Sequence, residues 1–328
     1  MVNKRGRLAI VIWLALSVIF FLTSCQKLKV NYIKANYHFN RANALFTDGQ
    51  YRRAIKEYEE AIKYNPNLIE AYRFAGEAYK NLFRPGDDRP DNMEKAEKAL
   101  EYLNKAYEFN PNSKEIIFSL GDMYDKLKRF EEAEKFYLKI LELEPGNMNN
   151  YYVVAEFYKR YAAEKEELRA KAESMYLRRI EADPENPQGY AYLANYYELI
   201  QPIPEFDKAN ENWERRISLD PENAEAYYAK GVNRWAKAYR LPQLPLEERL
   251  RLANESIKAL LKATELDPEY PEPYAYLSVV YKSVLAKLEP EKEARYNAEG
   301  DRYAEKFQEL RKRQAERKKL EEELKKIK

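Results

Sequence analysis

Two residue types that often carry chemistry occur once each in this 328-residue chain, as Cys25 and His38. A single thiol cannot form an internal disulfide, and a single imidazole leaves no set of ligands for a metal ion. The chain also has no Gly-rich phosphate loop and no nucleophile motif at a known catalytic spacing. We therefore expect a protein without catalytic residues, metal or cofactor, in which the thiol of Cys25 is the group placed for covalent modification.

The residues before Cys25 have the three regions of a secretory signal. Residues 1–7 carry three positive charges, an apolar run extends from Leu8 to Leu22, and two small polar residues precede the cysteine. An apolar helix of this length covers roughly 22 Å, which is short of the ~30 Å hydrocarbon core of a bilayer. A cleaved signal is therefore a better interpretation than a permanent spanning helix.

The ending Leu22-Thr23-Ser24-Cys25 resembles the lipobox of bacterial lipoproteins, in which the cysteine is acylated and the chain is cut just before it. The resemblance implies a signal peptide over 1–24 and a lipidated N-terminus with a short tether over 25–30. It also implies membrane attachment through the lipid, which holds firmly only with two or more acyl chains. Gln26 in place of Asp implies, in that family, sorting to the periplasmic face of the outer membrane in a cell that has one. An ordinary secretory signal and an uncleaved anchor remain the alternatives.

Behind this segment, one spaced pattern of residues returns along most of the chain. A large side chain is followed by Leu or Ala, then Gly or Ala, then Tyr, and one helix later by a small residue, an aromatic and a proline. The clearest copy consists of Ile117, Leu120, Gly121, Tyr124, Ala133, Tyr137 and Pro145. Small residues allow helices to approach closely, and a proline cannot continue a helix. The copies end at Pro66, Pro111, Pro145, Pro184, Pro221 and Pro268.

This pattern resembles the tetratricopeptide repeat. The resemblance implies an all-α fold, a right-handed superhelical solenoid of antiparallel helix pairs with a concave groove. We predict six clear repeats and a degraded seventh over 31–303, followed by a charged capping helix over 304–328. A composition with 34% charged residues and few glycines agrees with long helices that have one wet face.

The charge balance argues against nucleic acid as a partner. The formal net charge is +2, and it includes Lys4, Arg5 and Arg7 in the segment that we expect to be removed. A nearly neutral mature chain lacks the basic stripe that displaces counterions from phosphates.

Several hairpins depart from the repeat length between their two helices. Residues 84–90 are predicted to form a loop, with Asp91 and Glu94 as a capping box at the start of the next helix. The stretch 161–171 lacks Gly and Pro, so there we expect longer helices. Residues 241–245 form another predicted loop. Insertions on one edge of a solenoid can mark a binding face or reflect neutral drift.

Cations occupy positions where the repeat pattern expects small or apolar residues. Lys230 and Arg234 do so in the sixth repeat, and Arg179 and Arg216 in the second helices of the fourth and fifth. The two arginines could form a basic patch for an anionic partner. The alternative, which we favour, is that their stems cover apolar surface while their heads meet nearby acids.

In this family the first helix of each hairpin lines the groove, so the residue after each wedge aromatic should point inward. The resulting candidates for binding in the concave groove are Phe39, Asn43, Arg73, Glu77, Phe118, Asp122, Tyr152, Glu156, Asn195, Tyr228 and Trp235. Rings that supply contact area among polar groups that fix orientation suit peptides and sugars. The alternative is that many of the 29 tyrosines fill wedges between hairpins.

We expect a non-enzymatic, lipid-anchored scaffold that binds other proteins of the bacterial cell envelope, or their extended segments, during assembly of an envelope complex. The alternative is a lipoprotein of the outer membrane that captures glycans or peptides in the groove. An enzyme that uses groove carboxylates is the least supported class, because acids on repeat surfaces are usually solvated.

Overall fold

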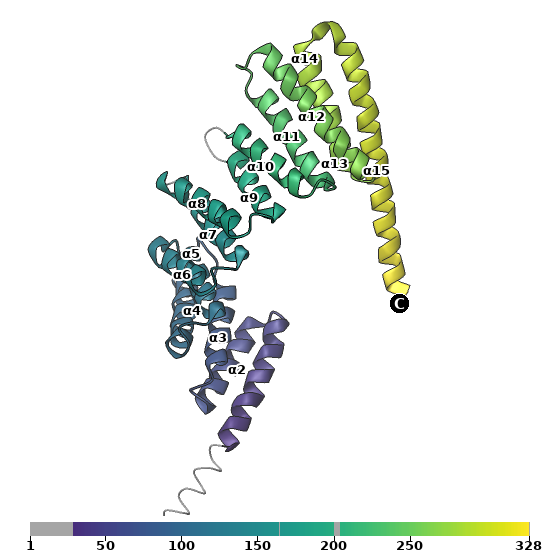
Figure 1. The fold of residues 1–328 in the computed structure, drawn as a ribbon. Coiled ribbons are helices and arrows are strands. Elements are labelled where there is room, and N and C mark those ends of the chain that lie inside the picture. The colour runs from purple at the N-terminus through teal and green to yellow at the C-terminus, as the bar shows by residue number, and fades with distance from the viewer. Residues whose placement is uncertain (1–28, 164, 200–203, 328) are drawn as a thin grey trace, which may run out of the picture. The chain divides into compact units, whose positions relative to one another are not determined.

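The computed structural model describes residues 29–163, 165–199 and 204–327, and side chains up to residue 325. The signal sequence and Cys25 lie outside the described residues, so cleavage and lipidation stay predictions. Within the described ranges the chain is all-α, without strands (Figure 1). The predicted fold class, a helical solenoid of antiparallel pairs, is confirmed. Among these helices none is both long and apolar enough to cross a membrane.

The chain divides into two compact units, with the boundary between Asn150 and Tyr151. The first unit holds three hairpins. A helix over residues 29–47 precedes α2 (Tyr51–Tyr64), α3 (Ile69–Leu82), α4 (Pro90–Phe109), α5 (Lys114–Lys126) and α6 (Phe130–Leu143). Each helix packs on the next, and the core at its start contains Ala42, Tyr58, Ala61 and Ala75.

The second unit continues the same alternation. Its helices are α7 (Met148–Tyr161, from Tyr151 on), α8 (Glu167–Ala182), α9 (Pro187–Leu199), α10 (Phe206–Leu219), α11 (Ala224–Arg240), α12 (Leu246–Leu266) and α13 (Pro271–Val280). A π-helical turn (Tyr281–Leu285), α14 (Ala286–Leu288) and a 3₁₀ turn (Pro290–Lys292) then lead to α15 (Glu293–Ile327). Its core gathers Leu252, Leu260, Leu277 and Val284 from neighbouring helices.

The six repeat prolines share one geometry. Each lies two residues after the last residue of its helix, namely α2, α4, α6, α8, α10 or α12. The residue between helix and proline has φ between −136° and −146° and ψ between 68° and 92° in all six places. A residue before proline avoids the α region, so the proline ends the helix at a fixed point. The repeats are therefore equivalent in backbone geometry as well as in sequence.

The small residues of the pattern are positions of close helix approach. A methyl group on Gly76 of α3 would lie 2.6 Å from Cγ of Leu103, and one on Gly231 of α11 would lie 2.6 Å from Cγ of Leu260. Both leucines are fully buried in the second helix of the same hairpin. Only glycine permits these two helix pairs to pack at this distance.

The expected capping box at α4 is wrong. The helix begins at Pro90, whose missing N–H needs no cap, and Asp91 already lies inside the first turn. The loop before it is instead held by Asn92, which is buried. Its amide donates to the carbonyls of Arg84 (2.9 Å) and Asp87 (2.7 Å) and accepts from the N–H of Arg84 (3.0 Å).

The expectation of longer helices in the fourth hairpin is also wrong. The described residues of 162–166 are not α-helical, although they contain neither Gly nor Pro. Ala162 and Leu168 are both buried. Residues six apart point to different faces of a continuous helix, so the chain must turn to bury both. The loop expected at 241–245 is present.

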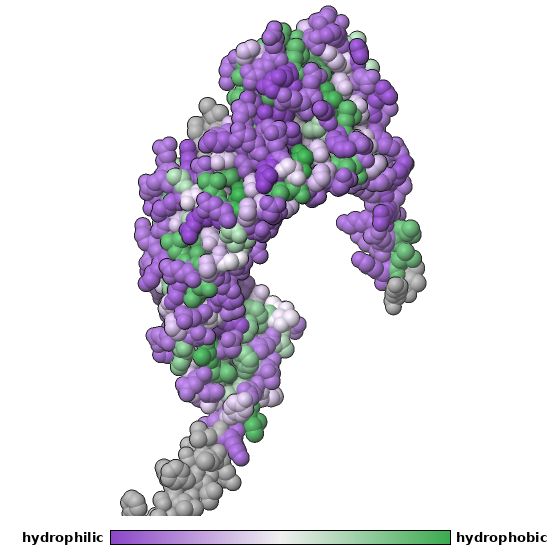
Figure 2. Space-filling model, in the orientation of Figure 1, coloured by the Kyte–Doolittle hydropathy of each residue, from purple (hydrophilic) through white to green (hydrophobic). Residues whose placement is uncertain are grey.

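The helix expected at 304–328 is the C-terminal part of α15, which begins at Glu293. Its first half packs on the seventh hairpin, where Tyr303 lies 5.8 Å from Tyr281 between ring centroids and Leu310 is buried. From residue 311 to 325 every residue is exposed, and this part projects beyond the neighbouring helices (Figure 1). Figure 2 shows it as hydrophilic except near its C-terminal end, where Leu320 and Leu324 are exposed.

Candidate functional site

The first-helix face of unit 1 carries six of the groove candidates. Phe39 and Asn43, on the helix over residues 29–47, are engaged in packing. The Phe39 ring lies 5.9 Å from Tyr58 and 6.2 Å from Phe74 between centroids, and the Tyr58 hydroxyl donates to Oδ1 of Asn43 at 2.8 Å. These two candidates join the first two hairpins and leave little free surface.

A line of alternating charges runs from α3 to α5 on this face. Lys80 pairs with Glu77 of its own helix at 2.9 Å and with Asp122 of α5 at 3.0 Å, and Asp122 also accepts from Lys126 at 2.5 Å. The hydroxyl of Ser119 donates to Glu77. The structure therefore brings Glu77 and Asp122 together through a lysine that was not among the candidates. We call these four charged residues the ion lattice.

Burial and pairing act in opposite directions on the pKa values of the ion lattice. Burial alone would raise the pKa of Asp122, but the bond from Lys126 and the charge of Lys80 hold it below its usual value. Burial likewise would lower the pKa of Lys80, while Glu77 and Asp122 raise it. Lys80 and Asp122 are therefore both held in their charged forms at neutral pH.

Arg73 and Phe118 complete the candidates of unit 1. The guanidinium of Arg73 lies 3.9 Å from the ring centroid of Phe74 and pairs with Glu70 at 2.7 Å. Phe118, on α5, is 43% exposed although it is a large apolar residue. It is the aromatic candidate of this unit that leaves a wide surface open to a partner.

In unit 2, α7 and α9 carry Tyr152, Glu156 and Asn195. The rings of Tyr152 and Tyr192 stack with centroids 4.3 Å apart. Glu156 accepts from the hydroxyl of Tyr176 at 2.6 Å, and burial, followed by the charge of Glu156, raises the pKa of Tyr152. Asn195 is exposed. Of these three, only Asn195 has no hydrogen bond or ring contact among the described residues.

Tyr228 and Trp235 of α11 meet through a third ring. Tyr276 lies 5.6 Å from Tyr228 and 5.2 Å from Trp235 between centroids. The indole N–H of Trp235 donates to Oγ of Ser283 at 3.1 Å, and burial raises the pKa of Tyr228. This cluster packs against the core of the unit. The two candidates are thus brought together, and both are only partly accessible.

Glu198 is the carboxylate of this unit with a raised pKa, and it was not among the candidates. Burial raises its pKa, and hydrogen bonds from Nε1 of Trp213 (2.9 Å) and Nδ2 of Asn233 (2.7 Å) oppose the shift. It connects α9, α10 and α11. The helical spacing placed Glu198 on this face, but its burial depends on tertiary packing that sequence spacing does not reveal.

The arginines of α8 and α10 follow the interpretation favoured above. Arg179 and Arg216 are both buried, and their guanidinium groups lie 4.5 Å from the ring of Tyr192 and 5.6 Å from that of Trp213. Arg216 also pairs with Glu225 at 3.0 Å. Neither arginine contributes to an exposed basic patch.

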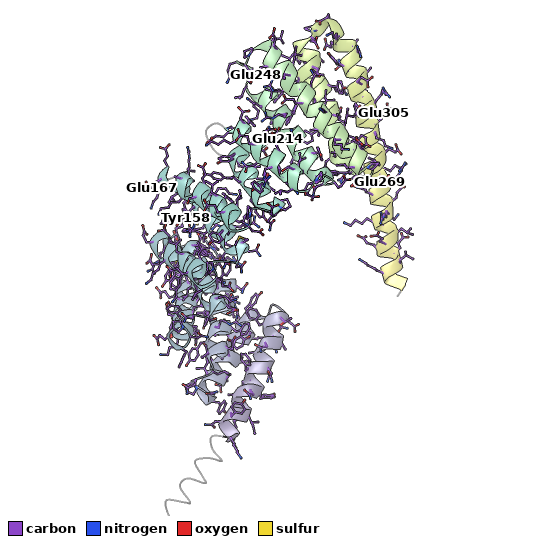
Figure 3. All side chains as sticks on the ribbon, viewed as in Figure 1. Tyr158, Glu167, Glu214, Glu248, Glu269 and Glu305 are labelled. Atoms are coloured by element: carbon purple, nitrogen blue, oxygen red, sulfur yellow. The ribbon has the colours of Figure 1, made fainter. Side chains whose placement is uncertain are left out.

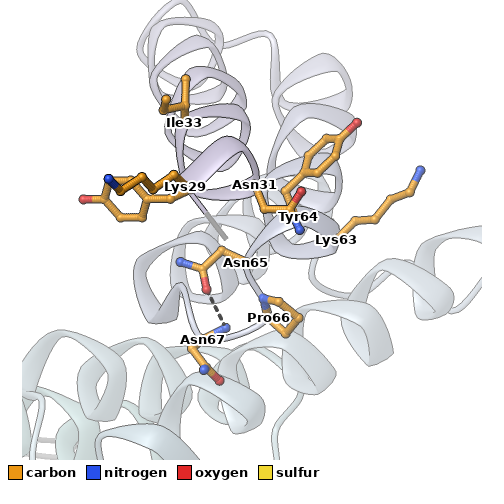
Figure 4. Close-up of a pocket in the computed structure, with 9 residues that line it drawn as sticks. Lys29, Asn31, Ile33, Lys63, Tyr64, Asn65, Pro66 and Asn67 are labelled. Atoms are coloured by element: carbon orange, nitrogen blue, oxygen red, sulfur yellow. Dashed lines mark hydrogen bonds between the residues drawn. The ribbon is translucent and has the colours of Figure 1, made fainter. Parts of the chain in front are cut away.

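A groove outside the predicted face lies at the start of unit 1 (Figure 4). It has a volume of about 890 Å³ and is lined by Lys29, Asn31, Tyr32, Ile33, Lys63, Tyr64, Asn65, Pro66 and Asn67. Asn65 stabilises the turn that lines the groove, because Oδ1 of Asn65 accepts a hydrogen bond from the N–H of Asn67 at 3.2 Å. The repeat pattern did not predict this groove, because its lining comes from the start of the first described helix, the end of α2 and the turn that follows, and not from the positions expected to face the concave groove.

Comparison with known proteins supports the repeat assignment. The tetratricopeptide repeat family matches residues 35–68, and a second tetratricopeptide repeat family matches residues 93–154. The chain contains tetratricopeptide repeats. The shared proline geometry extends the same unit to the fourth, fifth and sixth hairpins.

The similar curated proteins share only parts of their length with this chain. Hsp70-Hsp90 organizing protein 3 of Arabidopsis thaliana is 28% identical over 107 residues, 33% of this chain and 17% of that protein. Photosystem I assembly protein Ycf3 of Prochlorococcus marinus is 27% identical over 131 residues, 34% of this chain and 69% of that protein. Human protein O-mannosyl-transferase TMTC3 is 26% identical over 180 residues, 43% of this chain and 20% of that protein. Most of the first and third relatives therefore lies outside the match.

Among solved structures, that of MamA protein is similar to 63% of this chain over 96% of its own length, with 19% identity and a TM-score of 0.42. Tetratricopeptide-repeat proteins act as scaffolds or adaptors in protein interactions. The repeats therefore indicate a general role in protein interactions for this chain.

Proposed function

We propose that this protein is a lipid-anchored, non-enzymatic scaffold that displays its helical repeats close to a bacterial envelope membrane and binds other envelope proteins there. The observation that carries the proposal is the shared proline geometry of six repeats, because repeated hairpins of one geometry give each unit the extended helical surfaces on which repeat proteins bind partners. The anchor is proposed from the lipobox-like sequence at Cys25.

The start of the first described helix supports a position near a bilayer. Residue 29 is already helical, four residues after Cys25, and four residues reach at most roughly 14 Å. Val30, Ile33 and Tyr37 are exposed and lie on one face of this helix, and Lys34 lies beside them. Apolar and aromatic side chains next to lysines suit the interface of an anionic membrane.

The aromatic candidates favour a scaffold over a protein that captures small ligands. Stacking of a sugar needs a free ring face, yet Tyr152 is stacked on Tyr192, and Tyr228 and Trp235 are packed around Tyr276. Phe118 is exposed on a helix surface and lines none of the grooves described. A protruding ring of this kind suits insertion into a partner's pocket.

The lipid anchor is tested by metabolic labelling with a radioactive fatty acid in a bacterial host. The full chain should incorporate label and fractionate with membranes, while Cys25→Ser should lose both, because the thiol is the acylated atom. Label that persists in Cys25→Ser would refute the anchor. A chain that is soluble and unlabelled in both forms would refute it as well.

The partner surface is tested with a photo-crosslinking phenylalanine analogue at Phe118, in the full chain expressed in bacterial cells. Phe109 is the matched control, since it is also a phenylalanine of unit 1, is 40% exposed, and ends the second helix of its hairpin. We expect crosslinks to discrete envelope proteins from position 118 and few from 109. Equal crosslinking from both positions would refute the first-helix face as the binding surface.

A further inference from the structure

The sixth repeat contains a second groove, on the side of the second helices. It has a volume of about 750 Å³ and is lined by Asn210, Glu214, Tyr227, Lys230, Arg234, Arg251, Glu255, Lys258, Ala259, Leu261, Lys262 and Glu265. These residues come from α10, α11 and α12, and α11 packs against both of the other helices. Glu214 marks the α10 wall in Figure 3. This size is within the range of ligand sites in proteins.

The floor of the groove is polar because of the two cations that break the repeat pattern. Arg234 is only 4% exposed, and its Nη2 donates to the carbonyl of Phe206 at 2.7 Å. Its Nε donates to Oδ1 of Asn233 at 2.9 Å. Lys230 pairs with Glu214 at 2.9 Å. The groove therefore has cations where the repeat pattern expects apolar side chains.

Asn210 leaves one hydrogen-bond acceptor in the groove wall unused. Its Nδ2 donates to Oε1 of Glu214 at 3.0 Å, whereas its Oδ1 is buried and has no hydrogen-bond partner among the described residues. If the side-chain amide of Asn210 were rotated by half a turn, Oδ1 would face the carboxylate of Glu214 and the two oxygens would repel each other. The hydrogen bond to Glu214 therefore fixes the orientation of this amide. An unsatisfied buried acceptor costs about 1–3 kcal/mol. A ligand that supplies an N–H would remove that cost.

The wall formed by α12 carries a row of charges. Arg251, Glu255, Lys258 and Lys262 follow at spacings of four, three and four, which places them on one face of the helix. Arg251 pairs with Glu255 at 2.5 Å and Lys262 with Glu265 at 3.0 Å, whereas no ion pair or hydrogen bond engages Lys258 among the described residues. Lys258 and Lys262 are separated by a rise of about 6 Å along the helix.

These features select among possible anions. The groove is lined by five cations, Lys230, Arg234, Arg251, Lys258 and Lys262, and by three carboxylates, Glu214, Glu255 and Glu265, so a ligand whose negative charges are spaced apart fits this mixed lining better than a dense polyphosphate. Phosphate also offers no N–H for the unused acceptor. An extended peptide offers backbone N–H groups, and its alternate side chains lie about 6.6 Å apart on one face. That spacing matches the rise between the two lysines of α12.

We propose that this groove binds an extended acidic peptide segment of a partner protein, laid along α12 with carboxylates on Lys258 and Lys262 and a backbone N–H on Oδ1 of Asn210. The inference rests on the proposed scaffold role but not on the lipid anchor or on the first-helix face. The site is distinct from the predicted groove candidates, which lie on the first helices.

The test is fluorescence anisotropy with the full chain in detergent and a fluorescein-labelled, capped decapeptide of alternating Glu and Thr. Decapeptides with Gln or Lys in place of Glu, and inorganic polyphosphate, are the comparison probes. We expect saturable binding of the Glu peptide alone, weakened by added salt. The double variant Lys258→Glu with Lys262→Glu should weaken binding at least tenfold. The matched double reversal Lys318→Glu with Lys319→Glu, on the exposed part of α15, should stay within twofold.

Asn210→Leu separates a ligand contact from a structural role. It should weaken peptide binding several-fold and leave thermal stability nearly unchanged, because it deletes the unsatisfied acceptor together with the exposed hydrogen bond from Nδ2 to Glu214. The proposal is overturned if the Glu peptide does not bind at millimolar concentration, if both double variants bind alike, or if polyphosphate binds in its place. The crosslinking experiment at Phe118 and the labelling experiment at Cys25 test the proposed function separately. A negative result in either one does not change the result expected from the peptide-binding assay.

Discussion

Replacement of Gly231 by alanine is the sharpest test of how closely the hairpins pack. The added Cβ would lie 2.6 Å and 2.9 Å from Cγ and Cδ2 of Leu260, and 3.2 Å from the carbonyl oxygen of Ser256. Carbon atoms normally pack at about 3.5–4.0 Å. Leu260 is fully buried and the Ser256 oxygen belongs to the backbone of α12, so neither can move away without shifting the helix pair.

Two effects of opposite sign set the magnitude. Overpacking of a core typically costs about 1–3 kcal/mol, and alanine gains about 1 kcal/mol over glycine in a helix interior. Because the contact involves backbone as well as a buried side chain, we expect a net loss of about 1–2 kcal/mol. For a unit of this size, that lowers the unfolding midpoint by about 2–8 °C.

The matched control is Gly300→Ala in α15. Its Cβ would also meet atoms at 2.7 Å and 2.9 Å, but these belong to the flexible side chain of Lys282, which can swing aside. The helix-propensity gain is the same, so the midpoint should stay equal or rise. Tryptophan fluorescence during heating reports on unit 2 in a chain that lacks residues 1–24, since Trp13 is then absent and the other two tryptophans, Trp213 and Trp235, both lie in that unit. If Gly231→Ala unfolds at or above the midpoint of Gly300→Ala, the close approach of α11 and α12 is refuted.

Three further predictions concern buried polar groups. Burial raises the pKa of Glu198, so the stability that its protonated form contributes is present below the ordinary glutamate range and is lost as pH rises through the folded pKa. Glu198→Gln should remove this loss. Fluorescence melts whose midpoints fall equally with pH in Glu198→Gln and in the unchanged protein would contradict the prediction. The lowered pKa of Asp122 gives the opposite sign, because that stability is present above the ordinary aspartate range and is lost as pH falls. Asp122→Asn should therefore destabilise unit 1 by about 1–2 kcal/mol at pH 7 and flatten the acid limb of circular-dichroism melts, and an unchanged acid limb would argue against the ion lattice. Asn92→Ala leaves the N–H of Arg84 and the carbonyl of Asp87 without a partner, while the carbonyl of Arg84 keeps the N–H of Asp87. It should cost about 1–3 kcal/mol, seen as faster hydrogen exchange confined to the loop 84–90, and unchanged exchange there would show that Asn92 does not hold it.

Much of the fold could be predicted from the sequence because each repeat is specified locally. A proline that ends a helix and a glycine that admits a neighbouring helix act through residues close in the chain, so their spacing is enough to locate them. The positions of Pro145 and Gly121, for example, are explained by the structure as they were by the pattern. Cleavage and lipidation at Cys25 remain predictions.

The errors arose where distant contacts decide a local choice. The break at 162–166 contains no residue that disfavours a helix, and it exists because Ala162 and Leu168 must both be buried. The side chain of Asn92 shapes its loop through contacts to residues five and eight positions earlier, which no capping motif describes. Among the groove candidates, spacing correctly placed them on first helices, but it could not tell Phe118, which is exposed, from Phe39, which is consumed in packing.

The cations that break the repeat pattern show why a departure from a pattern is not by itself a site. Arg179 and Arg216 are buried against the rings of Tyr192 and Trp213, so their guanidinium groups contact neighbouring side chains and are not exposed to a partner. Arg234 is just as buried, but it lies beneath an open groove whose wall holds an unused acceptor at Asn210. Arg234 itself is paired, with the carbonyl of Phe206, Oδ1 of Asn233 and the carboxylate of Asp207. The difference lies in its neighbours in the groove, because Oδ1 of Asn210 has no hydrogen-bond partner among the described residues, and it is there that we propose a partner protein binds.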